Sequence, residues 1–181
     1  MNDIVNEAFL FAFSIHNGQL RKDGKPYIVH PFSVANTLAK NGASDELIAA
    51  GLLHDTIEDA HATPDELRKR FGDEVLRLVS FDTEDKTLPW EERKSATLSA
   101  VKTCDRQCAM LVCADKLSNI RDIASDLDKK GEAAWSIFKY GREKQEWLFK
   151  SFVTALERLS DLEMYQQFKT DVESVFDKKG E

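Results

Sequence analysis

Apolar residues recur three and four positions apart along nearly the whole chain, and this spacing predicts α-helices. No stretch of useful length shows the strict alternation that a half-buried β-strand requires. Only eight glycines and four prolines occur, and they fall mostly between the periodic segments, where helices are expected to end. We find no internal repeat, no low-complexity tract and no linker. The pattern therefore predicts a single all-α domain over residues 1–181, with the last helix ending near residue 177.

Capping signals place several of the helix ends. Ser44 is a good N-cap for a helix that we expect to include the sequence HDTIED at its C-terminal end. Thr63 precedes Pro64 and Glu66, which together form a capping box with proline in the first turn. Gly72 and Gly131 interrupt the periodic pattern. The expected helices cover about residues 2–16, 31–40, 91–103, 107–126, 132–157 and 159–177; further helices begin at Ser44 and Thr63, and another, after Gly72, contains Val75, Leu76, Leu78 and Val79.

The composition argues against several classes of protein. The chain has 181 residues and a formal net charge of −7, which argues against a protein that binds nucleic-acid backbones. The apolar runs are too short to span a membrane, and the N-terminus lacks the basic region of a signal peptide. Cys104, Cys108 and Cys113 are odd in number and contain no CxxC pair, so we expect buried thiols rather than a zinc site, and a reducing cytoplasm.

The sequence HDTIED, residues 54–59, is the first candidate for chemistry. It combines two metal-ligand types, His54 and Asp55, with two further carboxylates, Glu58 and Asp59. A solvated acidic helix face has a similar composition. However, this run follows the apolar segment LIAAGLL, which buries the helix, and a buried His-Asp pair is costly unless it is paired or binds a metal.

Two further segments carry residues that suit the same site. In ADKLSNIRD, the spacing of Asp115, Asn119 and Asp122 puts all three on one helix face next to an apolar run. Alone, Asp115 would more readily be a cap or the partner of an ion pair; combined with HDTIED, a role as a ligand is favoured. His30 precedes Pro31, where we expect a helix to begin, so its side chain can project inward as a ligand or pack as an ordinary core histidine.

Together, His30, His54, Asp55 and Asp115 form a set of two imidazoles and two carboxylates. Such a mixed nitrogen and oxygen site suits manganese, iron, zinc or magnesium. Glu58 and Asp59 are left over as carboxylates that can orient and deprotonate a water or protonate a leaving oxygen. This arrangement predicts metal-assisted hydrolysis of a phosphoester or pyrophosphate.

A few local cations can hold the phosphates of a substrate. Arg21 and Lys22 lie between Gly18 and Gly24, and a guanidinium can stack on a base or bind phosphate through two hydrogen bonds. A solvated basic loop is the alternative. Further candidates are Lys86, Arg93, Lys94, Lys139 and Arg142. The aromatic residues Trp90, Trp135, Tyr140 and Trp147 are expected to pack in the core.

The order RKDGKPYIVHP, HDTIED and ADKLSNIRD resembles the HD-type hydrolase domain of RelA/SpoT homologues, over about residues 5–155. The three segments in this order are far more specific than an HD pair alone. These enzymes degrade guanosine tetraphosphate and pentaphosphate (ppGpp and pppGpp). The chain is similar to the stand-alone, metazoan-type form, a single HD-type helical bundle.

The resemblance implies particular roles for individual residues. It makes His30, His54, Asp55 and Asp115 the ligands of one Mn²⁺ ion, and Glu58 and Asp59 the catalytic carboxylates. It places Arg21 and Lys22 near the base and phosphates, and Asn119 near the ribose. The implied reaction removes the 3′-pyrophosphate and gives GDP or GTP.

The chain departs from the family at three positions. Ser118 and Asp122 stand where many long members have His and Thr, and the charge of Asp122 near the pocket can alter which nucleotide is preferred. Trp90 follows TLP, where metazoan-type forms tend to have a lysine, which weakens an alternative function as an NADPH 2′-phosphatase. An adenosine-based alarmone, another nucleotide, and nucleotide sensing without turnover are the remaining alternatives.

Overall fold

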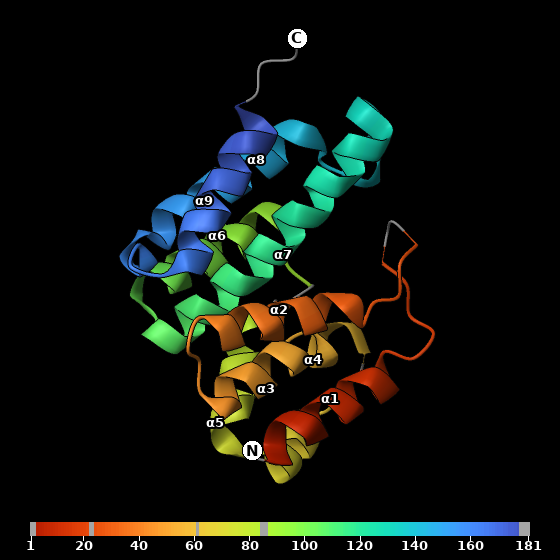
Figure 1. Ribbon diagram of the computed structural model, residues 1–181, viewed down its shortest axis with the longest axis vertical. Helices are drawn as coiled ribbons and strands as arrows, with labels where there is room; N and C mark the ends of the chain where they lie inside the picture. The colour runs from red at the N-terminus through yellow and green to blue at the C-terminus, as the bar shows by residue number, and fades with distance from the viewer. Residues whose placement is uncertain (1–2, 22–23, 61, 84–86, 178–181) are drawn as a thin grey trace.

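Helix α7 (Arg106–Lys130) is the longest helix of the computed structural model and runs through its middle (Figure 1). The structure describes residues 3–21, 24–60, 62–83 and 87–177. The apolar run at residues 110–114 is buried, and α7 contacts helices from both halves of the chain. The positions of the buried side chains on α7 are therefore fixed by packing on several sides.

The N-terminal half packs on one side of α7. Its helices are α1 (Asp3–Ile15), α2 (Val29–Lys40), α3 (Asp45–Leu53), α4 (Thr56–Ala60) and α5 (Pro64–Asp82). Figure 1 shows these five helices together in the red-to-yellow part of the molecule.

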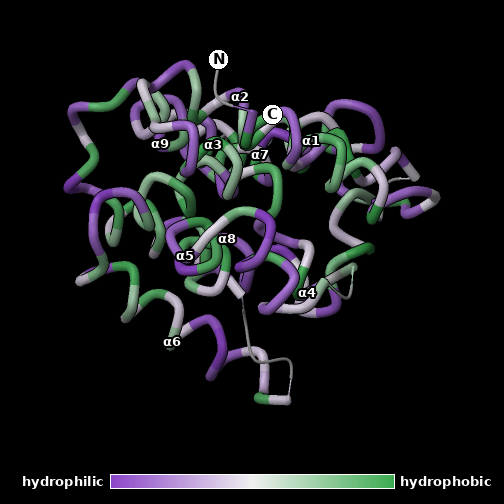
Figure 2. Tube along the Cα trace, turned by 90° about the horizontal axis from the view of Figure 1, so that it is seen from below, coloured by the Kyte–Doolittle hydropathy of each residue, from purple (hydrophilic) through white to green (hydrophobic). Residues whose placement is uncertain are grey.

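The C-terminal half packs on the other side. It contains α6 (Trp90–Thr103), the 3₁₀ helix η1 (Gly131–Ile137), α8 (Gly141–Ala155), the 3₁₀ helix η2 (Glu157–Leu159) and α9 (Glu163–Phe176). One cluster of buried apolar side chains extends from Ala8 to Phe176 and includes residues from both halves. In Figure 2, hydrophobic and hydrophilic stretches alternate along the helices, as expected of amphipathic helices that share a core.

The all-α prediction is confirmed: the described residues form helices, and their only β-type pairing is an isolated bridge between Leu20 and Pro26. Ser44 caps α3 by accepting a hydrogen bond from the Leu47 N–H (3.3 Å). Thr63 caps α5 by accepting one from the Glu66 N–H (3.2 Å). Gly72 kinks α5 with a φ of 85°. None of the helices in the described part of the chain combines the length and hydrophobicity needed to cross a bilayer.

The prediction that HDTIED continues the preceding helix is wrong. Helix α3 ends at Leu53, His54 and Asp55 form a turn, and α4 starts at Thr56. At this turn, two side chains donate hydrogen bonds to backbone carbonyls of α3. Nδ1 of His54 donates to the Gly51 carbonyl (2.9 Å), and the Thr56 hydroxyl donates to the Leu53 carbonyl (2.6 Å). Such local hydrogen bonds compete with the helical pattern.

Other helix boundaries also differ from those expected: α7 continues to Lys130 rather than ending near residue 126, and α9 begins at Glu163 rather than near residue 159. His30 lies inside the first turn of α2, which begins at Val29 rather than at Pro31; proline is tolerated there because first-turn N–H groups have no helical partner. The helix expected over residues 132–157 is divided into η1 and α8. Gly141, with a φ of 68°, starts the second piece in a conformation that favours glycine.

Candidate active site

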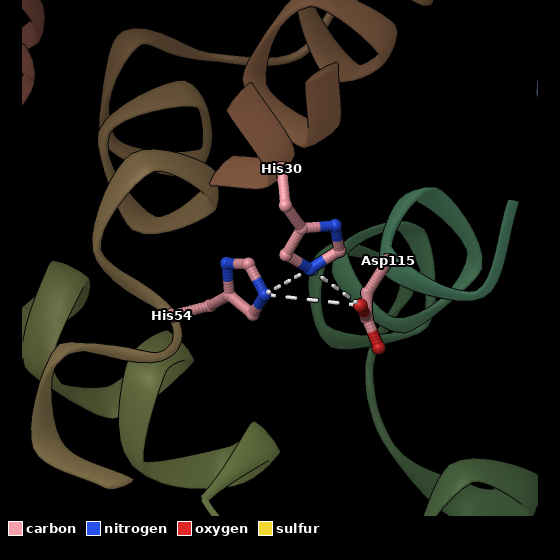
Figure 3. Close-up of side chains that lie close together, drawn as sticks. All are labelled: His30, His54 and Asp115. Atoms are coloured by element: carbon pink, nitrogen blue, oxygen red, sulfur yellow. Dashed lines mark hydrogen bonds and ion pairs between the residues drawn. The ribbon is translucent and has the colours of Figure 1, made fainter. Parts of the chain in front are cut away.

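Three segments that are far apart in the sequence bring their side chains together beside α7. His30 comes from the first turn of α2, His54 from the turn after α3, and Asp115 from α7. Figure 3 shows the two imidazole rings and the carboxylate pointing toward one another. Ligand atoms of all three lie within 4.8 Å of one another, and all three residues are buried.

The distances within this cluster are short. The two Nε2 atoms of His30 and His54 lie 3.2 Å apart. Oδ1 of Asp115 is 3.1 Å from Nε2 of His30 and 3.8 Å from Nε2 of His54. Oδ2 of Asp55 lies 3.1 Å from Nε2 of His54 and 3.6 Å from Nε2 of His30. The structure thus brings together all four residues of the predicted set.

The donor set fits a divalent cation. The Gly51 carbonyl can only accept, so Nδ1 of His54 carries a proton, and Nε2 presents a lone pair once a cation takes the place of the proton on that nitrogen. Ser118 Oγ lies 2.9 Å from Nδ1 of His30 and can accept from it, which leaves a lone pair at Nε2 of that ring as well. Two imidazole nitrogens and two carboxylate oxygens then face one another, an arrangement that a shared cation stabilises.

The electrostatics of the cluster favour a positive charge. Burial favours the protonated acid, but His54 and His30 outweigh it and lower the pKa of Asp55. Burial acts in the same way on Asp115, where Lys116 and the histidines lower the pKa. Burial opposes charging of His54, yet the Asp55 and Asp115 carboxylates raise its pKa to about 10. The pKa of His30 is lowered because burial prevails there.

Neighbouring side chains hold the carboxylates in place. The Tyr27 hydroxyl donates to Oδ2 of Asp55 (2.7 Å). Asn119 donates to Oδ1 of Asp115 (2.6 Å), and Lys116 donates to Oδ2 of Asp115 (2.5 Å). Such partners orient metal ligands and tune their basicity.

A pocket of about 430 Å³ opens beside this cluster. Its lining includes His30, Asp55 and Asp115, together with Glu58 from α4. The size falls within the range of small-molecule sites. Glu58 therefore lines the same pocket as three of the four cluster residues.

Three of the predicted substrate-contact residues, Arg21, Asn119 and Asp122, line this pocket and contact one another. Arg21 donates to Oδ1 of Asn119 (2.8 Å) and forms an ion pair with Asp122 (3.1 Å). Lys25 also pairs with Asp122 (3.5 Å). The loop that carries Arg21 is thereby fixed against α7, and Arg21, Asn119 and Asp122 all line the pocket.

Not every sequence candidate can be placed. Lys22 and Lys86 lie outside the described residues, as does the side chain of Asp59. Arg93 and Lys94 line the pocket, whereas Arg142 approaches Glu132 (3.8 Å).

The remaining sequence expectations concern packing. Cys108 and Cys113 are buried and Cys104 is half-buried, and all three are free thiols. Trp90 and Trp135 pack in the core as expected, but Trp147 is 44% exposed.

Sequence reasoning missed three residues of the site. Tyr27 lies three positions before His30, and a helical spacing to His30 could have suggested it. Lys116 directly follows Asp115. Asp82, the last residue of α5, lines the pocket, and burial raises its pKa to about 6. Nothing local distinguishes Asp82 from the other acids of its polar segment.

The helical fold and the His-Asp cluster define a metal-dependent phosphohydrolase of the HD type, and comparisons with known proteins agree. The HD domain family matches residues 8–139. The chain is 35% identical over 178 residues to mouse (Mus musculus) MESH1, named guanosine-3′,5′-bis(diphosphate) 3′-pyrophosphohydrolase, covering 96% of this chain and 93% of that protein. Identity to the Xenopus tropicalis protein of the same name is 40% over 124 residues, covering 66% and 69% of the two chains.

Two solved structures are also similar. The Listeria monocytogenes protein lmo0812 superposes with a TM-score of 0.78 at 37% identity, covering 82% of this chain and 99% of its own. A metazoan orthologue of SpoT that hydrolyses ppGpp gives a TM-score of 0.80 over 99% of this chain and 97% of its own, and at 24% identity it shows the shared fold. The chain belongs to the HD-domain family, as an enzyme of the MESH1/SpoT-like group of pyrophosphohydrolases.

Proposed function

We propose that this protein hydrolyses the 3′-pyrophosphate of ppGpp and pppGpp, giving GDP or GTP and pyrophosphate, with Mn²⁺ as its metal. The observation that carries the proposal is the convergence of His30, His54, Asp55 and Asp115 at a pocket that Glu58 also lines. The names of the relatives specify removal of the 3′-pyrophosphate from guanosine 3′,5′-bis(diphosphate), which is ppGpp. The three free cysteines are compatible with a reducing cytoplasm as its compartment.

The four-residue set would hold the ion through two nitrogens and two oxygens. When bound, a divalent ion supplies Lewis-acid chemistry, which polarises a phosphoryl oxygen and neutralises developing charge. Manganese accepts this mixture of imidazole and carboxylate donors.

The protein's own carboxylates then handle the protons. Glu58 and Asp59 are proposed to deprotonate the water that attacks the phosphorus next to the ribose 3′-oxygen, and to return a proton to that oxygen as the phosphorus–oxygen bond breaks. The water oxygen becomes part of the released pyrophosphate, and the nucleoside keeps its 3′-hydroxyl.

Basic residues that line the pocket orient the substrate. Arg21, held by Asn119 and Asp122, is positioned for the base or a phosphate, and Arg93 and Lys94 supply further positive charge. Lys22 and Lys86 remain proposed substrate contacts. Fixing the phosphates relative to the carboxylates lowers the entropic cost of the reaction.

The test is pyrophosphate release from ppGpp in the presence of Mn²⁺. We expect Glu58→Gln to lower kcat by about 10²- to 10⁴-fold, the usual contribution of a positioned general acid or base. Glu66→Gln, which removes an exposed acid on α5, is the matched control and should retain activity. Absence of release by the wild type, or a Glu58→Gln variant as active as the control, would rule the proposal out.

A further inference from the structure

Asp126 is a buried carboxylate for which the proposed reaction has no role. It lies on α7, is 6% exposed, and lines the pocket. Lys130 approaches its Oδ2 atom at 3.3 Å. Among the residues that the structure describes, Oδ1 takes part in no hydrogen bond or ion pair. Its Oδ1 atom is absent from the buried side-chain atoms that lack a partner, so it is open to the pocket, where a bound molecule can donate to it.

The side chains that line the pocket on this part of the chain are apolar. They are Ile123 on α7 and Ala134, Ile137 and Phe138 on and just after η1. Helix η1 packs against α7, so these residues and Asp126 come from two adjoining elements. Apolar walls with one carboxylate suit a flat heteroaromatic ring that has hydrogen-bond donors on its edge.

The two ends of a nucleotide differ in charge: the phosphates are anionic and the base is neutral. Phosphates would be attracted to an ion held by the His-Asp cluster and to Arg21, Arg93 and Lys94, which line the same pocket. An anionic carboxylate repels them. A base is uncharged and can approach Asp126 through its N–H groups.

The distance along the helix is compatible with one bound nucleotide. Asp115 and Asp126 are separated by three turns of α7, which at a rise of about 1.5 Å per residue amounts to roughly 16 Å. If the scissile phosphate lies near Asp115, the ribose and the base can extend along α7 toward Asp126. Asn119 and Asp122 lie between them on the same helix and also line the pocket.

We propose that Asp126 determines base specificity: its carboxylate accepts hydrogen bonds from the N1–H and 2-amino groups of guanine. This inference rests on the proposed function and adds the residue that recognises the base. Adenine presents an acceptor at N1 and has no 2-amino group, so the same carboxylate disfavours it. Xanthine has a carbonyl oxygen at position 2. A carboxylate cannot donate a hydrogen bond to this oxygen, whereas the NH₂ group of an asparagine can.

The experiment compares guanosine, xanthosine and adenosine 3′,5′-bis(diphosphates) as substrates of the wild type and of Asp126→Asn. The wild type should prefer guanosine. In the variant, kcat/KM for guanosine should fall about 10- to 100-fold, mainly through KM, because one acceptor of the two-point contact to the base edge becomes a donor that faces the 2-amino group. Its preference should move to xanthosine, since an asparagine can donate to the 2-oxygen.

Asp128→Asn is the matched control. Asp128 is exposed two positions further along α7, so this change removes the same charge from the same helix without altering the pocket. It should keep the wild-type order of substrates. An Asp126→Asn variant that folds and keeps the same guanosine-to-xanthosine ratio as this control would overturn the inference.

Failure of the proposed function gives a different result. If the wild type releases pyrophosphate from none of the three substrates, the reaction is excluded, and calorimetric binding of guanosine and xanthosine 3′,5′-bisphosphates decides the role of Asp126. If the wild type binds the guanosine bisphosphate more tightly and Asp126→Asn binds the xanthosine bisphosphate more tightly, base recognition by Asp126 is supported. If both proteins prefer the same nucleotide to the same extent, the inference is contradicted.

Discussion

Asp55 has one oxygen atom with three neighbours: Oδ2 accepts from Tyr27 (2.7 Å) and faces the Nε2 atoms of His54 and His30 at 3.1 Å and 3.6 Å. The Tyr27 hydroxyl therefore fixes the direction in which Asp55 presents its carboxylate. Tyr27 itself stacks on His16 at 4.8 Å between ring centroids, which a phenylalanine would preserve.

We predict that Tyr27→Phe lowers the affinity for Mn²⁺ about 10- to 100-fold, the usual effect of losing a partner of a metal ligand. The measurement is a Mn²⁺ titration followed by electron paramagnetic resonance. Tyr165→Phe is the control, because it also removes a hydroxyl hydrogen bond, to the Val153 carbonyl at 3.1 Å, away from the cluster. Equal Mn²⁺ affinities in the two variants would contradict the role assigned to Tyr27.

The close packing of α2 against α3 depends on Gly51. A Cβ atom at this position would lie 2.7 Å from Cδ1 of Leu38 and 3.3 Å from Cα of Ala35. Leu38 can shift, but the backbone at Ala35 cannot move without moving α2. These two helices position His30 and His54, so their separation sets the distance between the two imidazoles.

Gly51→Ala should lower the free energy of unfolding by about 1–3 kcal/mol, the usual cost of overpacking, although alanine favours helices over glycine. Urea denaturation measures this change. In a Leu38→Ala background, where space is available, the same substitution should cost less. A Gly51→Ala protein as stable as the wild type would show that the two helices are not in close contact here.

The sequence predicted elements whose signals are local and missed features that depend on distant contacts. The caps at Ser44 and Thr63 and the break at Gly131 follow from nearby residues. The turn at His54 depends on side chains that occupy backbone acceptors, which periodicity does not show. The four expected ligands come from three segments, α2, the α3–α4 turn and α7. The fold brings these segments together, and only the chemical types of the residues predicted that they would meet.

A bound ion would join these three segments of the molecule. Mass action then predicts that Mn²⁺ at a free concentration 100 times its dissociation constant stabilises the protein by about 2.7 kcal/mol. Scanning calorimetry should show a melting temperature several degrees higher with Mn²⁺ than after chelation. His54→Ala should melt at the same temperature in both conditions; an undiminished Mn²⁺ effect in that variant would place the ion elsewhere.

The position of the ion can be measured directly by anomalous diffraction from crystals grown with Mn²⁺. We predict one strong anomalous peak within bonding distance of Nε2 of His30, Nε2 of His54, Oδ1 of Asp115 and a carboxylate oxygen of Asp55. A peak that leaves out the two imidazoles, or no peak with the metal in excess, would contradict the site and the hydrolytic chemistry built on it.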